Sequence, residues 1–485
     1  DLRKRLIAEV RFLRAWDYFQ KVTHYGDVPL VTSVLEIKNA NLPRTEKAKV
    51  VEFILKELKE IAPQLPESYS GRITRGAALT LKARLELFEH QYDDCMATCS
   101  EVMGLGYELF PDYKGLFKIA NENNSEVILD VQYVESLYGN WVLGVLPPAS
   151  VGGWCSINPT QSLVDAFFME DGTEPILGYN ADGSPKINPN APLYSEKGFS
   201  TKPEYRATDY YLMDGYNDSN YPDVTPERDG KRLIVQPNTF NMYCHREPRF
   251  YLTVVWNGQW FKWENRNTNF LYGQPDGGPT HDAPQNGYLN RSRVSLDYIP
   301  RDNNHPYRPA IIFRMAEAYL SYAEALNESS ERMSHKQEIL DNLNKIRHRA
   351  GIAEYGTGTD ENGFTRIKIN FSDQKEVRRL IHKERRVEFV GEGVRYHDLR
   401  RWKTAHYGIG NLNEQGENPD WGVNGPDYGM NYYGTEYTDQ GDNAFFKRTK
   451  YMDRVYPRKF YWYPIHQSEI DKDPTLVQGP FWLGE

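Results

Sequence analysis

Two kinds of residue in this sequence could do chemistry on a bound molecule. The first is a run of carboxylates and guanidinium groups between residues 383 and 401, in which Glu384 and Glu388 are spaced one helical turn apart. Paired carboxylates are the groups that glycosidases use as acid and base or nucleophile. Both glutamates have arginines within helical reach, however, which lowers a carboxyl pKa and keeps the group ionised. A general acid needs the opposite shift, so we interpret the run as a structural ion-pair network.

The second kind is aromatic: the 485 residues include 34 Tyr and 10 Trp. A flat ring with a polar edge suits a ligand that has both apolar faces and hydroxyl groups, as a sugar does. Strand alternation would place only one or two rings of a group on a binding face. The alternative, that every ring is a packing residue, stays open because Trp is usually well buried. The candidate binding residues form three groups: Trp256, Trp260, Trp263 and Tyr272; Trp141 and Trp154; and Tyr210, Tyr211 and Tyr216.

Other catalytic and metal-binding patterns are not found. The sequence has no HExxH, P-loop, GxSxG or EF-hand pattern, and its 11 histidines include no i,i+4 pair. No cofactor is expected, although the acidic loops 214–218 and 276–282 could hold a structural calcium ion; such loops are more often simple turns. The four cysteines show no CxxC spacing, which favours buried free thiols over a disulfide or metal site: Cys95, Cys99, Cys155 and Cys244.

Charge and hydropathy exclude two further classes of function. The net charge of -9 argues against nucleic acid, because phosphate binding needs a basic surface. No run of about 18 apolar residues is present, so no segment is expected to span a membrane. Residues 1–12 already follow a helical pattern, which is typical of a fragment whose leader has been removed.

Helices are predicted on both sides of a long irregular stretch. In the first helix, the apolar stripe is predicted to comprise Leu6, Val10, Leu13, Ala15 and Phe19. Small residues within 73–103 would let two antiparallel helices approach closely, as in a tetratricopeptide hairpin. The predicted helices are 1–25, 46–62, 73–90, 92–103, 309–328, 335–350, 373–390 and 396–405.

The stretch from 104 to 309 is rich in Gly, Pro, Asn, Asp and Tyr, with short strand-like runs at 126–133 and 250–256. A stretch this long is expected to be an ordered insertion rather than a loop. The predicted fold is therefore mainly α: a tetratricopeptide-like helical scaffold with large irregular insertions and a few short strands. We expect one unit over 1–485, made of a helical part at 1–103, an insertion lobe at 104–309, a second helical part at 310–405 and an irregular tail at 406–485 packed on the scaffold.

Sequence motifs spread over nearly the whole chain resemble one family. The segment IHKERRVEFVGEGVRYHDLRRW (381–402) resembles the signature of the SusD/RagB family. Stretches in the family's order agree with it, at 11–30, 163–173, 247–251, 313–352 and 463–470. The chain departs from the family at His466, which stands where a proline is usual, and in the closing box at 478–482.

The resemblance implies a function as well as a fold. Family members bind glycans without cleaving them, on the outer face of a bacterial outer membrane, and deliver them to a SusC-like TonB-dependent transporter. The membrane would be contacted only through a lipid anchor outside this chain. Part of the usual sugar site comes from an N-terminal region that this chain lacks, so the candidate residues are expected to form an incomplete set.

Two alternatives to glycan capture stay open from the sequence. RagB-like relatives are associated with peptide uptake, so the cargo could be a peptide. A helical-scaffold glycoside hydrolase would require two carboxylates facing one cleft, and the sequence nominates no such pair. A tetratricopeptide adaptor fits less well, because insertions separate the helix pairs. The leading prediction is a non-enzymatic glycan-binding partner of a transporter.

Overall fold

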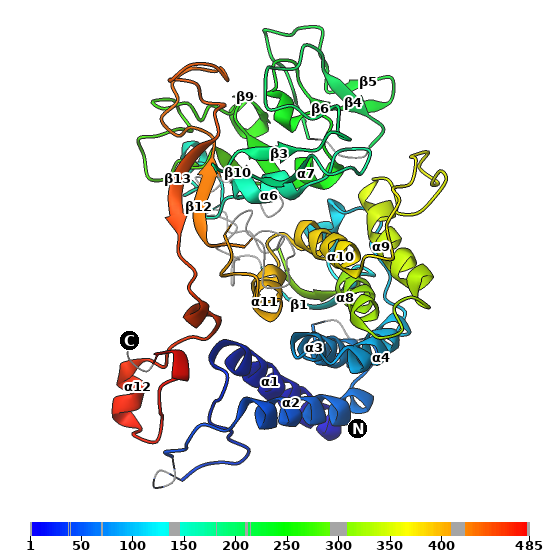
Figure 1. Cartoon of the computed structure of the whole chain (residues 1–485), viewed down its shortest axis with the longest axis vertical. Helices are drawn as coiled ribbons and strands as arrows, with labels where there is room; N and C mark the ends of the chain where they lie inside the picture. The colour runs from blue at the N-terminus through cyan, green and yellow to red at the C-terminus, as the bar shows by residue number, and fades with distance from the viewer. Residues whose placement is uncertain are drawn as a thin grey trace.

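The structure is a computed structural model, and its helices and its irregular lobe occupy different halves of the molecule (Figure 1). It describes residues 2–36, 38, 40–68, 71–134, 146–180, 182–208, 212–213, 215–291, 308–408 and 422–482, except for the side chain of Trp263. None of the helices in these ranges combines the length and the hydropathy needed to cross a membrane.

Two helix pairs form the N-terminal part of the scaffold. Helix α1 packs on α2 and α3 packs on α4. The Thr74 hydroxyl accepts a hydrogen bond from the Ala77 N–H and so caps α3. Ala77 and Ala78 are fully buried where α3 meets its neighbours, as the prediction of a close hairpin requires. The bounds are α1 Leu2–Tyr25, α2 Lys47–Ile61, η2 Ala62–Gln64, α3 Arg75–Phe88 and α4 Tyr92–Met103.

The predicted apolar stripe of α1 is wrong over its first half. Leu6, Val10 and Leu13 are 40%, 65% and 57% exposed. The buried face is made instead by Ala8, Phe12, Ala15, Phe19 and Val22. Both sets of residues recur at helical spacing, so periodicity alone could not choose between them. The face that has the small alanines packs against α2, since small side chains let two helices approach closely.

The second helical part begins later than the sequence indicated. Residues 310–314, predicted as the start of a helix, form strand β11 and pair antiparallel with β1. The β-branched Ile311 and Ile312 favour this extended form. Helix α8 then packs on both α4 and α9, which joins the two helical parts into one scaffold. The bounds are β1 Val127–Val131, β11 Ala310–Arg314, α8 Met315–Glu328, α9 Lys336–Ala350, α10 Gln374–Glu388 and α11 Val394–Arg401.

The insertion lobe consists of small antiparallel sheets joined by loops and short helices. The predicted strand at 250–256 is correct only at its end, because Pro248 starts the short helix α7 and only Val254–Trp256 is extended. Strands β7 and β10 pair, as do β2 with β3 and β8 with β9, and β4 and β5 flank β6. The lobe's elements are η3 Gly115–Phe117, η4 Ile119–Asn121, η5 Ala149–Val151, α6 Gln161–Ala166, β2 Ile176–Tyr179, β3 Pro185–Ile187, β4 Glu204–Arg206, β5 Glu227–Arg228, β6 Lys231–Val235, η6 Asn241–Tyr243, α7 Pro248–Thr253, β7 Val254–Trp256, β8 Trp260–Phe261, η7 Lys262–Glu264, β9 Arg266–Asn267 and β10 Tyr288–Asn290.

The C-terminal segment contacts both halves of the molecule. Met430, Phe445 and Phe446 belong to the core of the insertion lobe, beside the β12–β13 hairpin. The chain then runs down one side to α12 near α1 (Figure 1), where the Tyr463 N–H donates to the His24 carbonyl oxygen at 2.8 Å. The bounds are β12 Gly425–Gly429, β13 Thr449–Arg454, η9 Arg458–Tyr461, α12 Gln467–Lys472 and η10 Pro480–Trp482.

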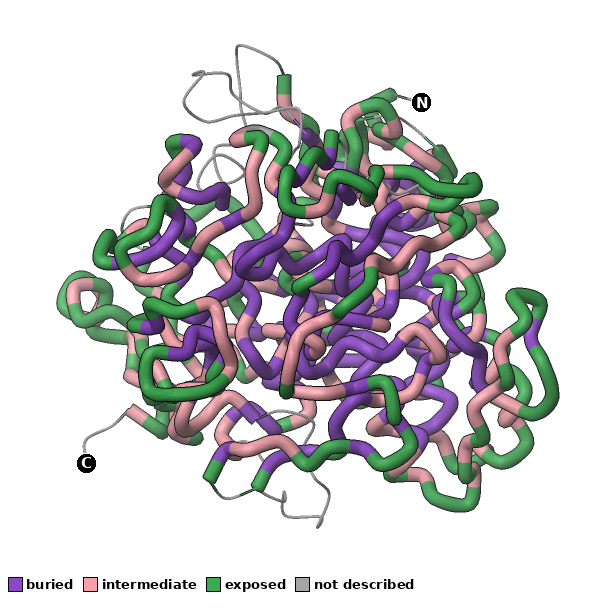
Figure 2. The backbone as a smooth tube through the Cα atoms, turned by 90° about the horizontal axis from the view of Figure 1, so that it is seen from above, coloured by how far each residue is buried: buried purple, intermediate pink, exposed green. Residues whose placement is uncertain are grey.

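Buried backbone gathers in the middle of the molecule, and exposed backbone forms its rim (Figure 2). The scaffold core is largely aliphatic, with Val50, Ile54, Leu58 and Leu81 fully buried. The lobe core is largely aromatic. Aromatic side chains bury a large area per residue, so they can hold together a lobe that has little regular secondary structure.

Candidate functional site

The charged run of α10 lies inside the molecule and not in a cleft. Glu384 and Glu388 are fully buried. Arg249, which lies on α7 of the insertion lobe, donates from Nη1 to Glu384 Oε1 at 2.6 Å and to Glu388 Oε2 at 3.0 Å. Arg347 on α9 donates to the other Glu384 oxygen at 3.2 Å. The run therefore attaches the lobe to the scaffold.

Glu388 is the centre of this arrangement. Arg314 Nη1 donates to Glu388 Oε1 at 2.7 Å, and Arg349 Nη2 donates to the same oxygen. Burial alone would raise the pKa of Glu388, but the charges of Arg349, Arg314 and Arg249 outweigh burial and hold it at about 2. The carboxylate stays ionised, so the interpretation as a structural network is confirmed. We call Arg249, Arg314, Arg347, Arg349, Glu384 and Glu388 the arginine–glutamate network.

The structure assigns most of the described candidate rings to the core. Trp256 is 0% exposed and stacks on Tyr243, with ring centroids 5.4 Å apart. Trp260 and Tyr216 are buried and pack edge to face. These three rings offer no face to a ligand, which corrects their selection as binding residues. Candidates outside the described residues are Trp141, Tyr210, Tyr211 and the side chain of Trp263.

Trp154 remains at the surface and is 60% exposed. A tight loop holds it there: the Gly153 N–H donates to the Pro148 carbonyl oxygen at 3.0 Å, and the Cys155 N–H donates to that of Pro147 at 3.1 Å. A Cβ at Gly153 would lie 2.0 Å from the Pro147 oxygen, so the loop can close only with glycine at this position. The fold thus presents the indole to solvent on a short, hydrogen-bonded loop.

A hollow of about 810 Å³ lies beside Trp154. The Asn158 amide donates to the Cys155 carbonyl oxygen at 3.0 Å, while its buried Oδ1 has no hydrogen-bond partner. A buried acceptor without a partner costs free energy unless a ligand or water satisfies it. We call this the Trp154 hollow; its lining residues are Trp154, Cys155, Ser156, Asn158, His281, Asp282, Ala283, Gln285, Asn286 and Tyr451.

Three tyrosines form a second surface feature, which we call the tyrosine cluster: Tyr272, Tyr432 and Tyr433. Tyr272 lies 6.0 Å from Tyr432 and 5.7 Å from Tyr433, measured between ring centroids. Tyr433 is 72% exposed, and the other two are half-buried. A Cβ at Gly278 would lie 2.5 Å from the Tyr432 hydroxyl oxygen, so this glycine lets the loop pass close to the rings.

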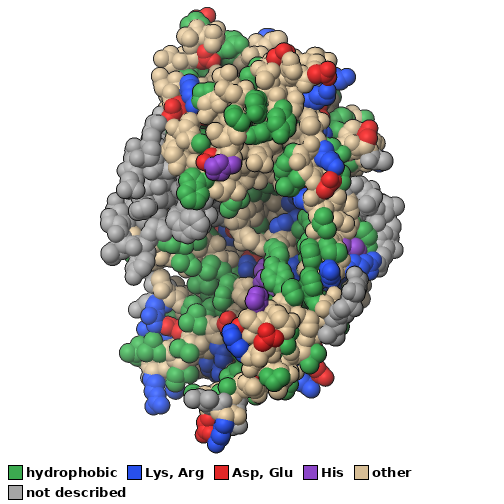
Figure 3. All heavy atoms as spheres, turned by 90° about the vertical axis from the view of Figure 1, so that its left-hand side faces the viewer, with side chains coloured by type: hydrophobic (Ala, Val, Ile, Leu, Met, Phe, Trp, Pro, Cys, Tyr) green, Lys and Arg blue, Asp and Glu red, His purple; other side chains and the backbone are tan. Residues whose placement is uncertain are grey.

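The loop 272–283 joins the two surface features. It begins at Tyr272, and the hydroxyl of Tyr432 donates to the Thr280 carbonyl oxygen at 3.2 Å. The next two residues, His281 and Asp282, line the Trp154 hollow. Strand β13, which contributes Tyr451, lies at the left edge of Figure 1, the side that Figure 3 turns toward the viewer. On the upper part of that face hydrophobic side chains gather in patches, as a surface that stacks against a ligand requires.

A larger hollow, of about 1110 Å³, lies elsewhere, between α9 and the loop that follows it. Glu354 in its wall is paired with Arg366 at 2.8 Å and with His348 at 3.2 Å. Its aromatic residues are Tyr355, which is buried, and Phe371, which is half-buried. Because Glu354 is already paired and neither of these two rings is exposed, this hollow is the weaker candidate for a binding site despite its size.

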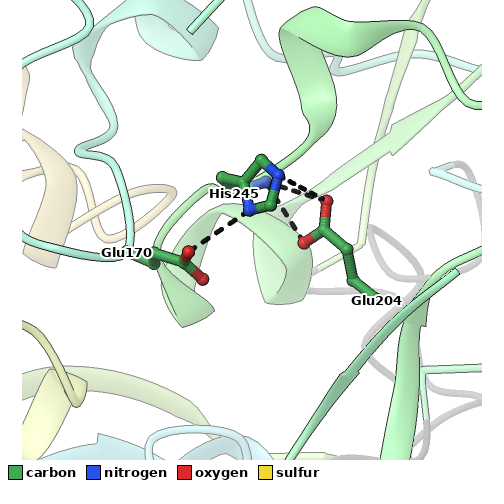
Figure 4. Close-up of side chains that lie close together, drawn as sticks. All are labelled: Glu170, Glu204 and His245. Atoms are coloured by element: carbon green, nitrogen blue, oxygen red, sulfur yellow. Dashed lines mark hydrogen bonds and ion pairs between the residues drawn. The ribbon is translucent and has the colours of Figure 1, made fainter. Parts of the chain in front are cut away.

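Glu170, Glu204 and His245 converge in the lobe, with ligand-type atoms within 4.8 Å of one another. Figure 4 shows the imidazole between the two carboxylates. His245 Nδ1 lies 3.2 Å from Glu170 and Nε2 lies 3.7 Å from Glu204. Arg206 also approaches Glu170, at 2.7 Å. Because the two carboxylates meet different ring nitrogens and a guanidinium group already occupies the cluster, the arrangement is an ion-pair clamp rather than a metal-ligand set.

The acidic loops and the cysteines have structural contacts. Asp276 accepts two hydrogen bonds from Arg266, and Asp218 accepts one from Asn267 Nδ2 at 2.9 Å. These contacts favour turns; Asp214 lies outside the described residues, and a calcium ion stays a prediction. All four cysteines are buried and free, which confirms that prediction: Cys95, Cys99, Cys155 and Cys244.

Comparison with known proteins shows the family. The SusD family model matches residues 115–482, and the chain therefore belongs to the SusD family. SusD-like protein P25 of Formosa agariphila is 23% identical over 404 residues, which are 82% of this chain and 63% of that protein. Starch-binding protein SusD of Bacteroides thetaiotaomicron is 30% identical over 201 residues, 36% of this chain and 35% of that protein.

A solved structure supports the same assignment. A SusD-like protein from Bacteroides fragilis is 28% identical, with a TM-score of 0.70 over 99% of this chain and 80% of that chain. The predicted fold class is thereby confirmed: a mainly helical, tetratricopeptide-like scaffold with short strands. The chain spans less than two thirds of the P25 relative.

Sequence reasoning missed several residues of the surface site. Tyr432, Tyr433 and Tyr451 lie in the segment expected to be a structural tail. Asp282 was noted only as part of an acidic loop, and Asn158 was not noted. The adjacent pair Tyr432-Tyr433 in a glycine-rich stretch was a usable signal, because consecutive tyrosines seldom both point into a core.

Proposed function

We propose that this protein is a non-catalytic, cell-surface glycan-binding protein, which captures oligosaccharides at the Trp154 hollow and the tyrosine cluster. The observation that carries the proposal is the 60% exposed indole of Trp154 beside the unpartnered Asn158 oxygen. A sugar ring stacks its C–H face on an indole, and its hydroxyl groups donate to acceptors at the edge of the ring.

Binding without cleavage fits the placement of the carboxylates. Glycoside hydrolysis uses two carboxyl groups facing one bond. Among the described residues that line the Trp154 hollow, Asp282 is the single carboxylate, and the pair at helical spacing on α10 is buried and paired with arginines. We propose that the captured glycan passes unmodified to a SusC-like TonB-dependent transporter. Membership of the SusD family supports this partner, and it supports a lipid-anchored position on the outer membrane.

The test measures polysaccharide binding by affinity electrophoresis and by isothermal titration, using wild type, Trp154→Ala and Phe481→Ala. Phe481 is a matched control, because it is 57% exposed but lies in η10 and does not line the Trp154 hollow. Trp154→Ala is expected to lose about 1–3 kcal/mol of binding free energy, and Phe481→Ala to lose none. Equal affinities for wild type and Trp154→Ala would remove the hollow from the site. Release of reducing ends from the bound polymer would overturn the non-catalytic assignment.

A further inference from the structure

The Trp154 hollow differs in its charge from two other hollows among the described residues. Among the described residues that line it there is no lysine or arginine, whereas Asp282 presents a half-buried carboxylate. The hollow beside α9 contains Lys345, Arg366 and Lys368 in its wall, and the one beside α1 contains Arg72.

Acidic groups also lie behind the surface of the hollow. Burial, together with the nearby carboxylates of Asp276 and Asp282, raises the pKa of the Cys155 thiol to about 12. At the opposite wall, the Tyr451 hydroxyl donates to Asp427 Oδ2 at 3.1 Å. Two of these carboxylates have an arginine nearby: Arg266 pairs with Asp276 at 2.6 Å, and Arg454 lies 3.5 Å from Asp427. The partner of Asp282 is instead His281, at 3.2 Å. His281 is 92% exposed, so water screens this pair.

The polar residues that line the hollow include acceptors for hydroxyl groups, besides hydroxyl and amide groups that can also donate. Asn158 Oδ1 has no partner, and an ionised Asp282 can only accept hydrogen bonds. Hydroxyl groups of a neutral sugar can donate to both. A uronate carboxylate or a sulfate ester offers only acceptors. Its charge would be placed next to Asp282, and the described part of the hollow's wall has no guanidinium or ammonium group to pair with it.

We infer that the Trp154 hollow selects neutral, hydroxyl-rich glycans and rejects uronate-containing and sulfated ones. This inference rests on the proposed function and adds its ligand class. Trp154 supplies the stacking surface, Asn158 and Asp282 supply acceptors for hydroxyl groups, and Asp282 repels anions. Since a neutral ligand carries no charge, its affinity is expected to be independent of ionic strength.

The experiment is affinity electrophoresis of the purified chain in gels containing one polymer each. The neutral polymers are dextran, galactomannan and xyloglucan; the anionic polymers are polygalacturonate, alginate and chondroitin sulfate. We expect retardation by at least one neutral polymer and by no anionic polymer, with an affinity unchanged between about 50 and 500 mM salt. Trp154→Ala is expected to lower the neutral affinity about tenfold or more.

Variants at Asp282 test the charge itself. Asp282→Asn is expected to bind the neutral polymer several-fold more weakly, because a charge-assisted hydrogen bond is lost, and Asp282→Lys is expected to gain retardation by polygalacturonate. Asp442→Asn is the matched control: this carboxylate is fully exposed on the same lobe, and its removal is expected to change neither result.

The outcomes separate the inference from the proposed function. Retardation of wild type by an anionic polymer, lost in Trp154→Ala, overturns the neutral selectivity but leaves glycan binding standing. Unchanged rejection of polygalacturonate by Asp282→Lys overturns the role of Asp282. Retardation by a neutral polymer that survives Trp154→Ala overturns the site, and a folded wild type retarded by none of the six polymers overturns the proposed function itself.

Discussion

The arginine–glutamate network and the Trp154 hollow treat their polar groups in opposite ways. In the network, Arg249, Glu384 and Glu388 are fully buried, and every carboxylate oxygen accepts from a guanidinium group. In the hollow, Trp154 is 60% exposed and Asn158 Oδ1 has no partner. Arg249 Nη2 and Arg349 Nε of the network also have no hydrogen-bond partner, but they lie in the interior, whereas the hollow has an exposed indole beside its unpartnered acceptor. The more strongly charged region is therefore structural, and the hollow with its exposed ring is the one suited to a ligand.

This difference shows how to interpret a charged motif in an uncharacterised chain. The glutamates of the charged helix α10 are satisfied by arginines of neighbouring elements, because an unpaired buried charge is costly. A binding surface keeps part of its hydrogen-bonding capacity free and leaves a ring uncovered. Substitutions in the network are therefore expected to change the stability of the fold, and substitutions in the hollow are expected to change ligand binding.

The largest expected effect is on stability. Glu388→Gln leaves three arginines without their shared countercharge, and loss of one partner of a buried ion pair costs about 3–5 kcal/mol. Urea unfolding followed by circular dichroism measures the change. The control is Glu469→Gln on the exposed face of α12, which is expected to leave the midpoint unchanged. An unchanged midpoint for Glu388→Gln would contradict the structural role of the network.

The buried Trp256 and the exposed Trp154 are expected to differ in their contributions to the free energy of unfolding. Trp256→Ala empties the centre of the lobe core and is expected to cost about 3–5 kcal/mol of unfolding free energy. Trp154→Ala is expected to leave unfolding within about 0.5 kcal/mol of wild type, because it removes a surface ring. Parallel urea titrations check both. Comparable losses of stability would mean that Trp154 is a packing residue.

Acid should weaken the arginine–glutamate network. The pKa of Glu388 is about 2 in the folded protein, below its usual 4.5, so its stabilising contribution is present above pH 4.5 and is lost as pH falls toward 2. Urea midpoints between pH 7 and pH 3 should fall more steeply for wild type than for Glu388→Gln. Parallel curves for the two proteins would show that Glu388 is not the group concerned.

The tyrosine cluster should contribute a smaller binding effect than Trp154. Tyr433→Ala removes an exposed ring that packs on Tyr272, with an expected loss of about 1 kcal/mol in glycan affinity by titration calorimetry. The double variant with Trp154→Ala tests whether one ligand spans both features: additive losses are expected. A Tyr433→Ala variant with wild-type affinity would restrict the site to the Trp154 hollow.

The smallest effect concerns the clamp at His245. Its hydrogen bond to Glu170 raises the pKa of His245 above 6.5, so its contribution to stability is complete below pH 6.5 and is lost as pH rises through the folded pKa. His245→Gln should flatten the dependence of thermal unfolding on pH in this range. If His245→Gln keeps the pH dependence of the wild type, a group other than His245 must cause that dependence.

The sequence predicted the fold well where one cause dominated. The predicted ends of α2, α3 and α4 lie within about two residues of the observed ends. The ionised state of Glu388 was predicted correctly but for the wrong reason, because the arginines that hold it are Arg349, Arg314 and Arg249 from other elements and not those on its own helix. The predicted apolar stripe of α1 was wrong over its first half because that helix has apolar residues at helical spacing on two faces. Residues 310–314 form a strand because they pair with β1, a contact far away in the chain.

The site was harder to predict than the fold. Trp154 follows two glycines and Trp256 follows two valines, yet both were selected as candidate binding residues. Tertiary packing decides that the first is exposed and the second buried. The hollow combines residues from 154–158, 281–286 and 451, and no local pattern indicates that these meet. Its unsatisfied Asn158 oxygen is visible only once every other hydrogen bond has been placed.

The most direct test of the central claim is a crystal structure of the protein with the neutral oligosaccharide that binds it most tightly. Our account predicts a sugar ring stacked on the indole of Trp154 at about 4 Å, with a hydroxyl group within hydrogen-bond distance of Asn158 Oδ1 or the Asp282 carboxylate. An oligosaccharide bound elsewhere, with only solvent in the Trp154 hollow, would contradict it.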